Sequence, residues 1–225
     1  TITASSRLAR LGLNAQWRSL IEETFLADSP VAYYPLGEPE GSTLAADVSG
    51  LGAPPLRMVG AGSAVTFGQA TGPGTDDLTA ATFVASGKTL AASTPPQSYA
   101  GISVDMFFLA TAAPAFTSFF VGGRDLATTF GIGVTSSGVP IAAVGGTFNG
   151  PTNICDGLTH HLALTWDGTT GRLYVDGVEV NNAASAGSPE IGAMIVGNTF
   201  MAMTAAHAAQ YGTALSAARV LAHAT

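Results

Sequence analysis

The first regular pattern of hydrophobic positions lies in residues 14–27. Apolar side chains recur there at the i, i+3, i+4, i+8 spacing of one helical face: Trp17, Leu20, Ile21 and Phe25. Asn14 is a suitable N-cap, and Pro30 follows the segment, where the residue before a proline avoids the α region. The pattern predicts an amphipathic helix whose apolar stripe packs on the rest of the chain or on a neighbouring subunit.

After Pro30 the pattern changes to short apolar runs separated by glycine-rich turns. Such runs predict an antiparallel sandwich or barrel. The strand–helix–strand repetition that would indicate a parallel sheet does not occur in the sequence. A short closing helix is predicted over 215–224, with Ser216 as its cap and with Val220 and Leu221 facing inward. The predicted strands are 31–36, 63–67, 78–84, 101–110, 116–122, 129–135, 139–146, 159–166, 171–177, 178–183, 190–198 and 201–211.

Residues 160–180 (HHLALTWDGTTGRLYVDGVEV) predict a three-stranded meander. Because successive side chains of a strand point to opposite faces, one alternating set should face the core: His160, Leu162, Leu164 and Trp166. Asp176 and Gly177 form a strong two-residue hairpin signal, and both Asp167 and Asp176 are typical turn formers. His160 and His161 point to opposite faces, so we do not expect them to share a metal ion.

Composition narrows the classes of function. Only 10% of the 225 residues are charged, the net charge is −7, and the eight basic residues form no cluster, so nucleic acid is not an expected partner. No stretch reaches the ~18 apolar residues that span a membrane. The single cysteine, Cys155, excludes an internal disulfide and a cysteine-based zinc site.

Three segments carry a family pattern. Residues 26–50 combine paired tyrosines with Leu-Gly-Glu and Asp-x-Ser-Gly, and residues 208–224 end in Leu-Ser-x-x-x-Val-x-x-His. With the meander of 160–180, they resemble the opening, the ending and the signature hairpin of laminin G-like modules of the concanavalin A-like superfamily. The resemblance implies an all-β, two-sheet antiparallel jelly-roll sandwich over 29–225. It leaves residues 1–28 as an N-terminal docking segment with its helix.

The first functional hypothesis is an enzyme. Glucanases of this superfamily carry a Glu-x-Asp-x-x-Glu cluster on one strand, because retaining hydrolysis needs two carboxyl groups about 5 Å apart. No such cluster occurs here, and Asp105 stands alone in its strand. No Gly-x-Ser-x-Gly motif occurs either. We therefore expect no catalytic residues.

The second hypothesis is a glycan-binding module, because sugars stack on aromatic rings. The candidate rings are Tyr33, Tyr34 and Tyr174, together with Tyr211 and with Tyr99 in a loop. Calcium often accompanies binding in laminin G-like modules, through oxygen ligands that this chain offers at Asp47 and Ser49, or at Asp76 and Asp77. The same residue types are typical of turns. No other cofactor is expected.

The third hypothesis is a virion component. A helix that runs into the 26–50 pattern resembles laminin G-like modules of minor tail proteins in phages of actinobacteria, and this implies a protein assembled into virions in the host cytoplasm. Trp17, Leu20, Ile21 and Phe25 would then dock it on other virion proteins, and a homotrimer is the expected state. A tail component can also contact host-surface polysaccharide. A capsid decoration or cement protein and a free carbohydrate-binding module are the alternatives.

Overall fold

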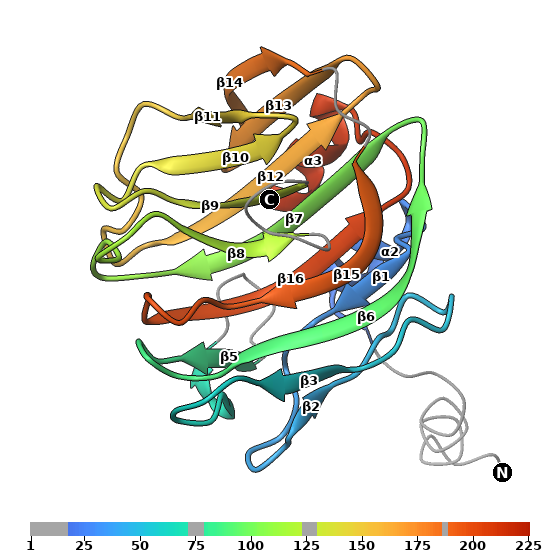
Figure 1. Ribbon diagram of the computed structural model, residues 1–225. Coiled ribbons are helices and arrows are strands. Elements are labelled where there is room, and N and C mark those ends of the chain that lie inside the picture. The colour runs from blue at the N-terminus through green and yellow to red at the C-terminus, as the bar shows by residue number, and fades with distance from the viewer. Residues whose placement is uncertain (1–17, 72–78, 123–129, 186–188) are drawn as a thin grey trace, which may run out of the picture.

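Antiparallel strands are the main secondary structure of the chain, and they form two sheets that lie face to face (Figure 1). The computed structural model describes residues 18–71, 79–122, 130–185 and 189–225. The two-sheet antiparallel sandwich expected from the sequence is confirmed.

Both sheets are eight-stranded within the described residues. The first sheet has the order β14 (Val178–Ala184), β13 (Thr170–Val175), β12 (Thr159–Trp166), β7 (Ile102–Leu109), β16 (Met203–Tyr211), β5 (Thr79–Phe83) and β4 (Thr66–Thr71), with β1 (Ala32–Tyr34) also paired to β16. The second sheet has the order β11 (Thr147–Asn149), β10 (Pro140–Val144), β9 (Phe130–Val134), β8 (Ser118–Gly122), β15 (Glu190–Val196), β6 (Thr89–Ser98), β3 (Leu56–Val59) and β2 (Leu44–Ala45).

The larger core lies between the sheets. Alternate residues of the central strands supply it, as the pleat requires, and among them are Leu162, Leu164 and Trp166 of β12. The predicted core-facing set of β12 is therefore confirmed for these three residues. The hairpin turn is confirmed as well, since Asp176 and Gly177 have φ values of 50° and 78°, the positive pair of a type I′ turn.

The outer face of the first sheet is also buried, because two helices cover β7, β12 and β16. Helix α2 (Leu20–Leu26) and helix α3 (Ala217–Ala224) supply Ile21, Phe25 and Val220 to a second apolar cluster. Phe25 is completely buried, and its ring stacks on His223 at 4.3 Å and on Tyr33 at 5.3 Å. Ile21 and Phe25 of the predicted apolar stripe thus pack on the sandwich.

This packing bears on the predicted docking residues. Ile21 and Phe25 are buried within the chain itself and are not available to another subunit. Leu20, in contrast, is 83% exposed, and Trp17 lies outside the described residues. Hydrophobic burial, which forms any protein core, holds Ile21 and Phe25 against the sheet.

The helix boundaries differ from the sequence prediction. Ser19, not Asn14, caps α2, through a capping box in which Ser19 Oγ accepts from the Glu22 amide and the Glu22 carboxylate accepts from the Ser19 amide. Ser216 caps α3 as predicted. The inward position predicted for Leu221 is wrong: it is 48% exposed, and His223 fills that side of the helix next to Val220.

Four strands were not predicted: β2, β3, β6 and β11. The longest is β6, whose sequence TLAASTPPQS lacks apolar alternation and contains two prolines. Proline has no N–H for the ladder and is normally excluded from a paired strand. The strand tolerates Pro95 and Pro96 because pairing with β15 is interrupted there, and it resumes at Gln97 opposite Ile191.

Replacement of Phe25 tests whether α2 belongs to the core. We expect Phe25→Ala to lower the free energy of unfolding by about 3–5 kcal/mol, because a buried ring leaves a cavity. The matched control is Leu20→Ala in the same helix, which should change it by less than about 0.5 kcal/mol because Leu20 is exposed. Chemical denaturation measures both, and equal small losses would contradict the packing of α2 on the sandwich.

Candidate functional site

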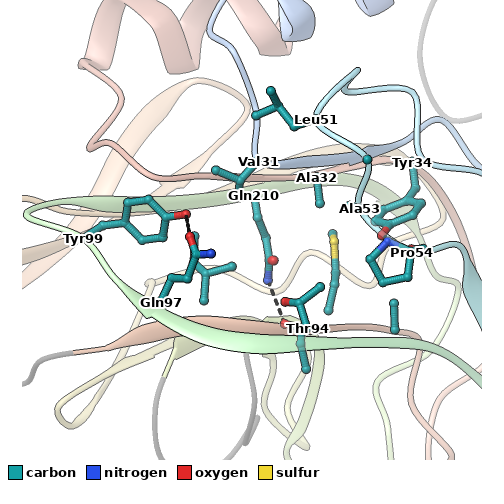
Figure 2. Close-up of a pocket in the computed structure, with 15 residues that line it drawn as sticks. Val31, Ala32, Tyr34, Leu51, Ala53, Pro54, Thr94, Gln97, Tyr99 and Gln210 are labelled. Carbon is teal, nitrogen blue, oxygen red and sulfur yellow. Dashed lines mark hydrogen bonds between the residues drawn. The ribbon is translucent and has the colours of Figure 1, made fainter.

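A cleft of about 230 Å³ opens between the two sheets beside β1, β6 and β15 (Figure 2). Its walls come from five parts of the chain: residues 31–34, the loop 51–54, strand β6 with Tyr99 after it, strand β15, and Gln210 of β16. Among the described residues, no charged side chain lines it. The lining residues are Val31, Ala32, Tyr34, Leu51, Gly52, Ala53, Pro54, Ala92, Thr94, Gln97, Tyr99, Ile191, Ala193, Met194 and Gln210.

One wall of the cleft is a bulge in the β6–β15 ladder. Ser93 pairs with Ala193 and Gln97 pairs with Ile191, so three residues of β6 oppose the single Gly192. A Cβ at Gly192 would lie only 2.8 Å from the Pro96 backbone, so glycine is what allows this close approach. Bulges redirect side chains at functional sites, and this one directs Thr94 and Gln97 to the cleft.

Gln210 crosses the interior from the first sheet to the second. Its Nε2 donates to the carbonyl oxygens of Gly122 at 3.0 Å and of Ala193 at 3.3 Å. The side chain is buried, and its amide lies in the middle of the lining residues (Figure 2). Because a buried polar group needs a partner, these bonds fix the amide and tie β16 to β8 and β15.

The rim of the cleft is formed by Tyr99 and Gln97. The Tyr99 hydroxyl donates to Gln97 Oε1 at 2.7 Å. The Tyr99 ring lies against Gly212, where a Cβ would come within 2.4 Å of it. The missing side chain at Gly212 therefore lets the half-buried ring lie flat beside the cleft.

The loop that closes the other side is organised by Asp47. Its Oδ1 accepts from the amides of Tyr33 and Ser49, and its Oδ2 accepts from Ser49 Oγ and the Ala53 amide, at 2.8–3.2 Å. A carboxylate has about four lone-pair positions, and four donors fill them. Asp47 and Ser49 are therefore held by groups of the chain itself, and the calcium site there stays a prediction. Asp76 and Asp77 lie outside the described residues.

The predicted tyrosines are placed as follows. Tyr33, Tyr34 and Tyr174 are at most 2% exposed, and Tyr211 is also buried. Tyr34 contributes to the cleft wall, with its hydroxyl donating to the Pro54 carbonyl, whereas Tyr33 and Tyr174 pack beneath the helices. None of these rings offers an open face to a sugar, and Tyr99 is the tyrosine at the cleft rim.

A second cavity, of about 350 Å³, lies beside β14 and is built around His160. His160 Nδ1 lies 2.8 Å from Asp176 Oδ2, and Nε2 lies 3.2 Å from Asp156 Oδ1. Hydrogen bonds from the Leu158 amide and from His160 hold the pKa of Asp156 below its usual value. The charged groups here, His160, Asp156 and Asp176, already contact one another, which makes the uncharged cleft the better candidate.

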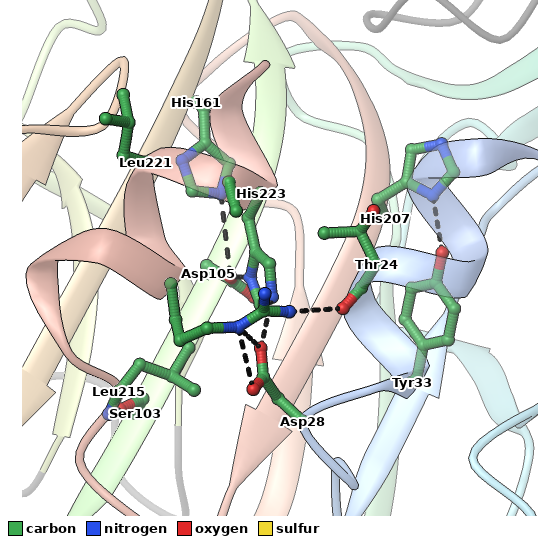
Figure 3. Close-up of polar contacts among 12 residues, drawn as sticks. Thr24, Asp28, Tyr33, Ser103, Asp105, His161, His207, Leu215, Leu221 and His223 are labelled. Carbon is green, nitrogen blue, oxygen red and sulfur yellow. Dashed lines mark hydrogen bonds and ion pairs between the residues drawn. The ribbon is translucent and has the colours of Figure 1, made fainter.

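Sequence reasoning missed a buried polar network under α3 (Figure 3). His223 joins Asp105 (Nδ1 to Oδ2, 2.6 Å) to Asp28 (Nε2 to Oδ2, 2.8 Å), and Arg219 Nε reaches Asp28 at 2.8 Å. Asp105 is therefore not isolated in the fold. His161 also faces it, at 3.5 Å. No local sequence pattern indicates these contacts, because the partners of Asp105 come from another strand and from a helix far along the chain.

The charges of this network stabilise one another. Burial alone would lower the pKa of His223, but the Asp105 charge and the bonds to Asp105 and Asp28 raise it above its usual value. Burial would likewise raise the pKa of Asp105, but the charge of His223, its hydrogen bond to Asp105 and the nearby His161 lower it. Both pKa shifts favour the charged forms of Asp105 and His223, because each charge is next to the other.

Comparison of this chain with known proteins supports the two-sheet sandwich fold. Residues 85–220 match a laminin G-type model described as the Concanavalin A-like lectin/glucanases superfamily, and the chain belongs to that superfamily. No curated protein matches the chain. Among the described residues, no helix has both the length and the hydrophobicity needed to cross a membrane.

Several solved structures share the fold. The binding domain of Paraclostridial Mosquitocidal Protein 1 has a TM-score of 0.66 and 14% identity, covering 87% of this chain and 52% of that one. Domain 4 of an extracellular arabinanase from Geobacillus stearothermophilus, solved with arabinotriose, has a TM-score of 0.63 and 17% identity, covering 88% and 98%. The botulinum neurotoxin serotype D binding domain has a TM-score of 0.66 and 10% identity, covering 88% and 51%. The chain thus spans about half the length of the two toxin domains.

Replacement of Asp47 tests its role in the cleft loop. We expect Asp47→Ala to lower the free energy of unfolding by about 2–3 kcal/mol, because it leaves the amides of Tyr33, Ser49 and Ala53 without their charged acceptor. Ser49→Ala removes one donor and should cost about 1 kcal/mol. Urea denaturation gives both values. A clear rise in the melting temperature of the wild-type chain on addition of Ca²⁺, lost in Asp47→Ala, would contradict this assignment.

Proposed function

We propose that this chain is a non-enzymatic carbohydrate-binding module that holds a neutral glycan in the uncharged cleft. The observation that carries the proposal is the lining: amide, hydroxyl and backbone groups around an apolar floor, with no charge. Such a surface satisfies sugar hydroxyl groups by hydrogen bonding and packs against the apolar faces of the rings. The volume of about 230 Å³ is below the roughly 300–1,000 Å³ of typical small-molecule pockets, so we expect it to take the end of a glycan.

The solved structures of similar fold support a binding role. One was solved with arabinotriose, and another, of botulinum neurotoxin type C, is described as dependent on two ganglioside molecules for cell entry. Arabinotriose and the gangliosides are ligands of those proteins. They indicate that this sandwich serves as a support for sugar recognition, with the contact residues differing from one protein to the next.

The absence of catalysis is part of the proposal. Glycoside hydrolysis requires two carboxyl groups, about 5–5.5 Å apart in retaining enzymes and farther apart in inverting ones. In the part of the chain that the structure describes, no carboxylate lines the cleft. The side chains that do line it bind and orient a sugar but do not supply an acid and a base.

We also propose that the module is displayed on a virion, as part of a phage minor tail protein. The support is the resemblance of the helix and residues 26–50 to such modules and the low charged fraction of 10%, since subunit interfaces are depleted of charge. A capsid decoration protein remains the alternative. The exposed Leu20 is the part of the predicted docking stripe that is described and free to contact another subunit.

The cleft makes a direct binding prediction. Calorimetric titration with neutral oligosaccharides, including arabinotriose, should detect binding that Gln97→Ala and Tyr99→Ala weaken at least about tenfold, the loss of one or two good polar or stacking contacts. The controls are Phe116→Ala and Phe200→Ala, which alter the exposed aromatic pair whose centroids lie 5.4 Å apart. If only the phenylalanine variants lose binding, the glycan site is that pair and not the cleft.

The virion role predicts association. Light scattering of the purified chain should give three times its 22.5-kDa mass if the trimer expected from the sequence forms without other virion proteins. A monomer at all concentrations would contradict self-assembly and would leave the binding prediction for the cleft unaffected.

A further inference from the structure

Three metal-ligand side chains converge on the outer face of the first sheet, beneath α3. Asp105 of β7, His161 of β12 and His223 of α3 are each at most 1% exposed, and one ligand atom from each lies within 4.8 Å of the others. Asp105 Oδ2 lies 2.6 Å from His223 Nδ1 and 3.5 Å from His161 Nε2. Figure 3 shows both imidazole rings directed toward the carboxylate.

The cluster contains buried polar atoms that the described chain does not satisfy. Asp105 Oδ1 and both ring nitrogens of His161 have no hydrogen-bond partner among the described residues, because the 3.5 Å contact of His161 is too long for a good hydrogen bond. The Tyr211 hydroxyl, on the same face, also has no hydrogen-bond partner among the described residues. Native proteins pair nearly all such atoms, so each exception requires an explanation.

We propose that Asp105, His161 and His223 bind one divalent transition-metal ion, with Zn²⁺ as the expected occupant. The ligand atoms are a carboxylate oxygen of Asp105, Nε2 of His161 and Nδ1 of His223. Two imidazoles with one carboxylate suit zinc, which also accepts a water molecule as its fourth ligand. Bound in this way, the ion gives a partner to Nε2 of His161 and to a carboxylate oxygen of Asp105.

Of the two ligand–ligand distances to Asp105, one matches a tetrahedral site and the other is shorter. Zinc–ligand bonds of about 2.0–2.1 Å at tetrahedral angles separate the ligand atoms by roughly 3.3–3.4 Å. The 3.5 Å between Asp105 and His161 already matches. The 2.6 Å between Asp105 and His223 is a hydrogen bond, in which a proton occupies the position of the ion. To admit zinc, that pair must separate by about 0.7 Å.

The surroundings of His223 are those of a metal ligand. A ligating histidine normally donates its second N–H to a carboxylate, which fixes the tautomer and the ring orientation. Here Asp28 Oδ2 lies 2.8 Å from His223 Nε2, and Arg219 holds Asp28 through contacts of 2.8 Å and 3.0 Å. Asp28 therefore directs Nδ1 of His223 toward Asp105, so we assign Asp28 as the residue that positions this ligand.

The second Asp–His group does not offer an equivalent site. Asp156 and Asp176 contact opposite nitrogens of His160, so one ion cannot bind all three. His160 lies next to His161 in sequence but on the other face of β12, which makes it the matched control for a histidine substitution.

Because the site is fully buried, the ion should enter while the chain folds, and its binding then adds to folding stability. The test uses the full chain without an affinity tag. It is unfolded in guanidinium with a chelator, and refolded by dialysis with or without Co²⁺, a spectroscopic substitute for Zn²⁺. We expect one Co²⁺ per chain, a visible absorption band of tetrahedral nitrogen–oxygen coordination, and a higher melting temperature than in the metal-free preparation.

Variants locate the ion. His161→Gln and Asp105→Asn should each abolish the cobalt band. Asp28→Asn should weaken Co²⁺ binding by about 10–100-fold. His160→Gln should leave the cobalt band and the Co²⁺ affinity unchanged. If His161→Gln does not refold, the Asp28 and His160 variants still decide the assignment. A wild-type chain that retains no metal after refolding, or a cobalt band lost in His160→Gln but kept in His161→Gln, would overturn the proposal.

Discussion

The hydrogen-bonded chain from Asp105 through His223 to Asp28 is the contact on which the arrangement of the first sheet and its helices depends. Its members come from β7, from α3 and from the residues that follow α2, so one set of contacts positions all three elements. Removing one partner of such a buried pair leaves an uncompensated charge, which is far more costly than the loss of a surface contact. Phe25, stacked on His223, adds apolar burial to the same junction.

This junction also explains which parts of the fold could be predicted from the sequence. Alternation in residues 159–166 correctly identified a strand and its inward face, and Asp176-Gly177 correctly identified the hairpin turn, because both signals are local. Burial of the opposite face depends on helices elsewhere in the chain. His223 is 118 residues from Asp105, so no local pattern could indicate that they meet.

The cleft was harder to predict for a related reason. Tyrosines were chosen as candidates for their chemistry, but the hydrophobic effect buries most of them, and only Tyr99 reaches the rim. Gln210 looks unremarkable within a strand, and its role follows from carbonyl groups on the facing sheet. The Pro95-Pro96 pair was the one available signal, because two prolines next to a predicted sheet favour a bulge over a continuous strand.

The bulge in β6 also has a consequence for how the cleft can evolve. Residues 94–96 are opposed by Gly192 alone, and they lie between the two stretches of paired backbone that fix the register of β6. Substitutions at Thr94 can therefore alter the hydrogen-bonding groups and the shape of the wall while the pairing on either side is preserved. The sandwich separates the residues that define its architecture from those that define its selectivity, so lineages can diversify their ligands on a constant framework.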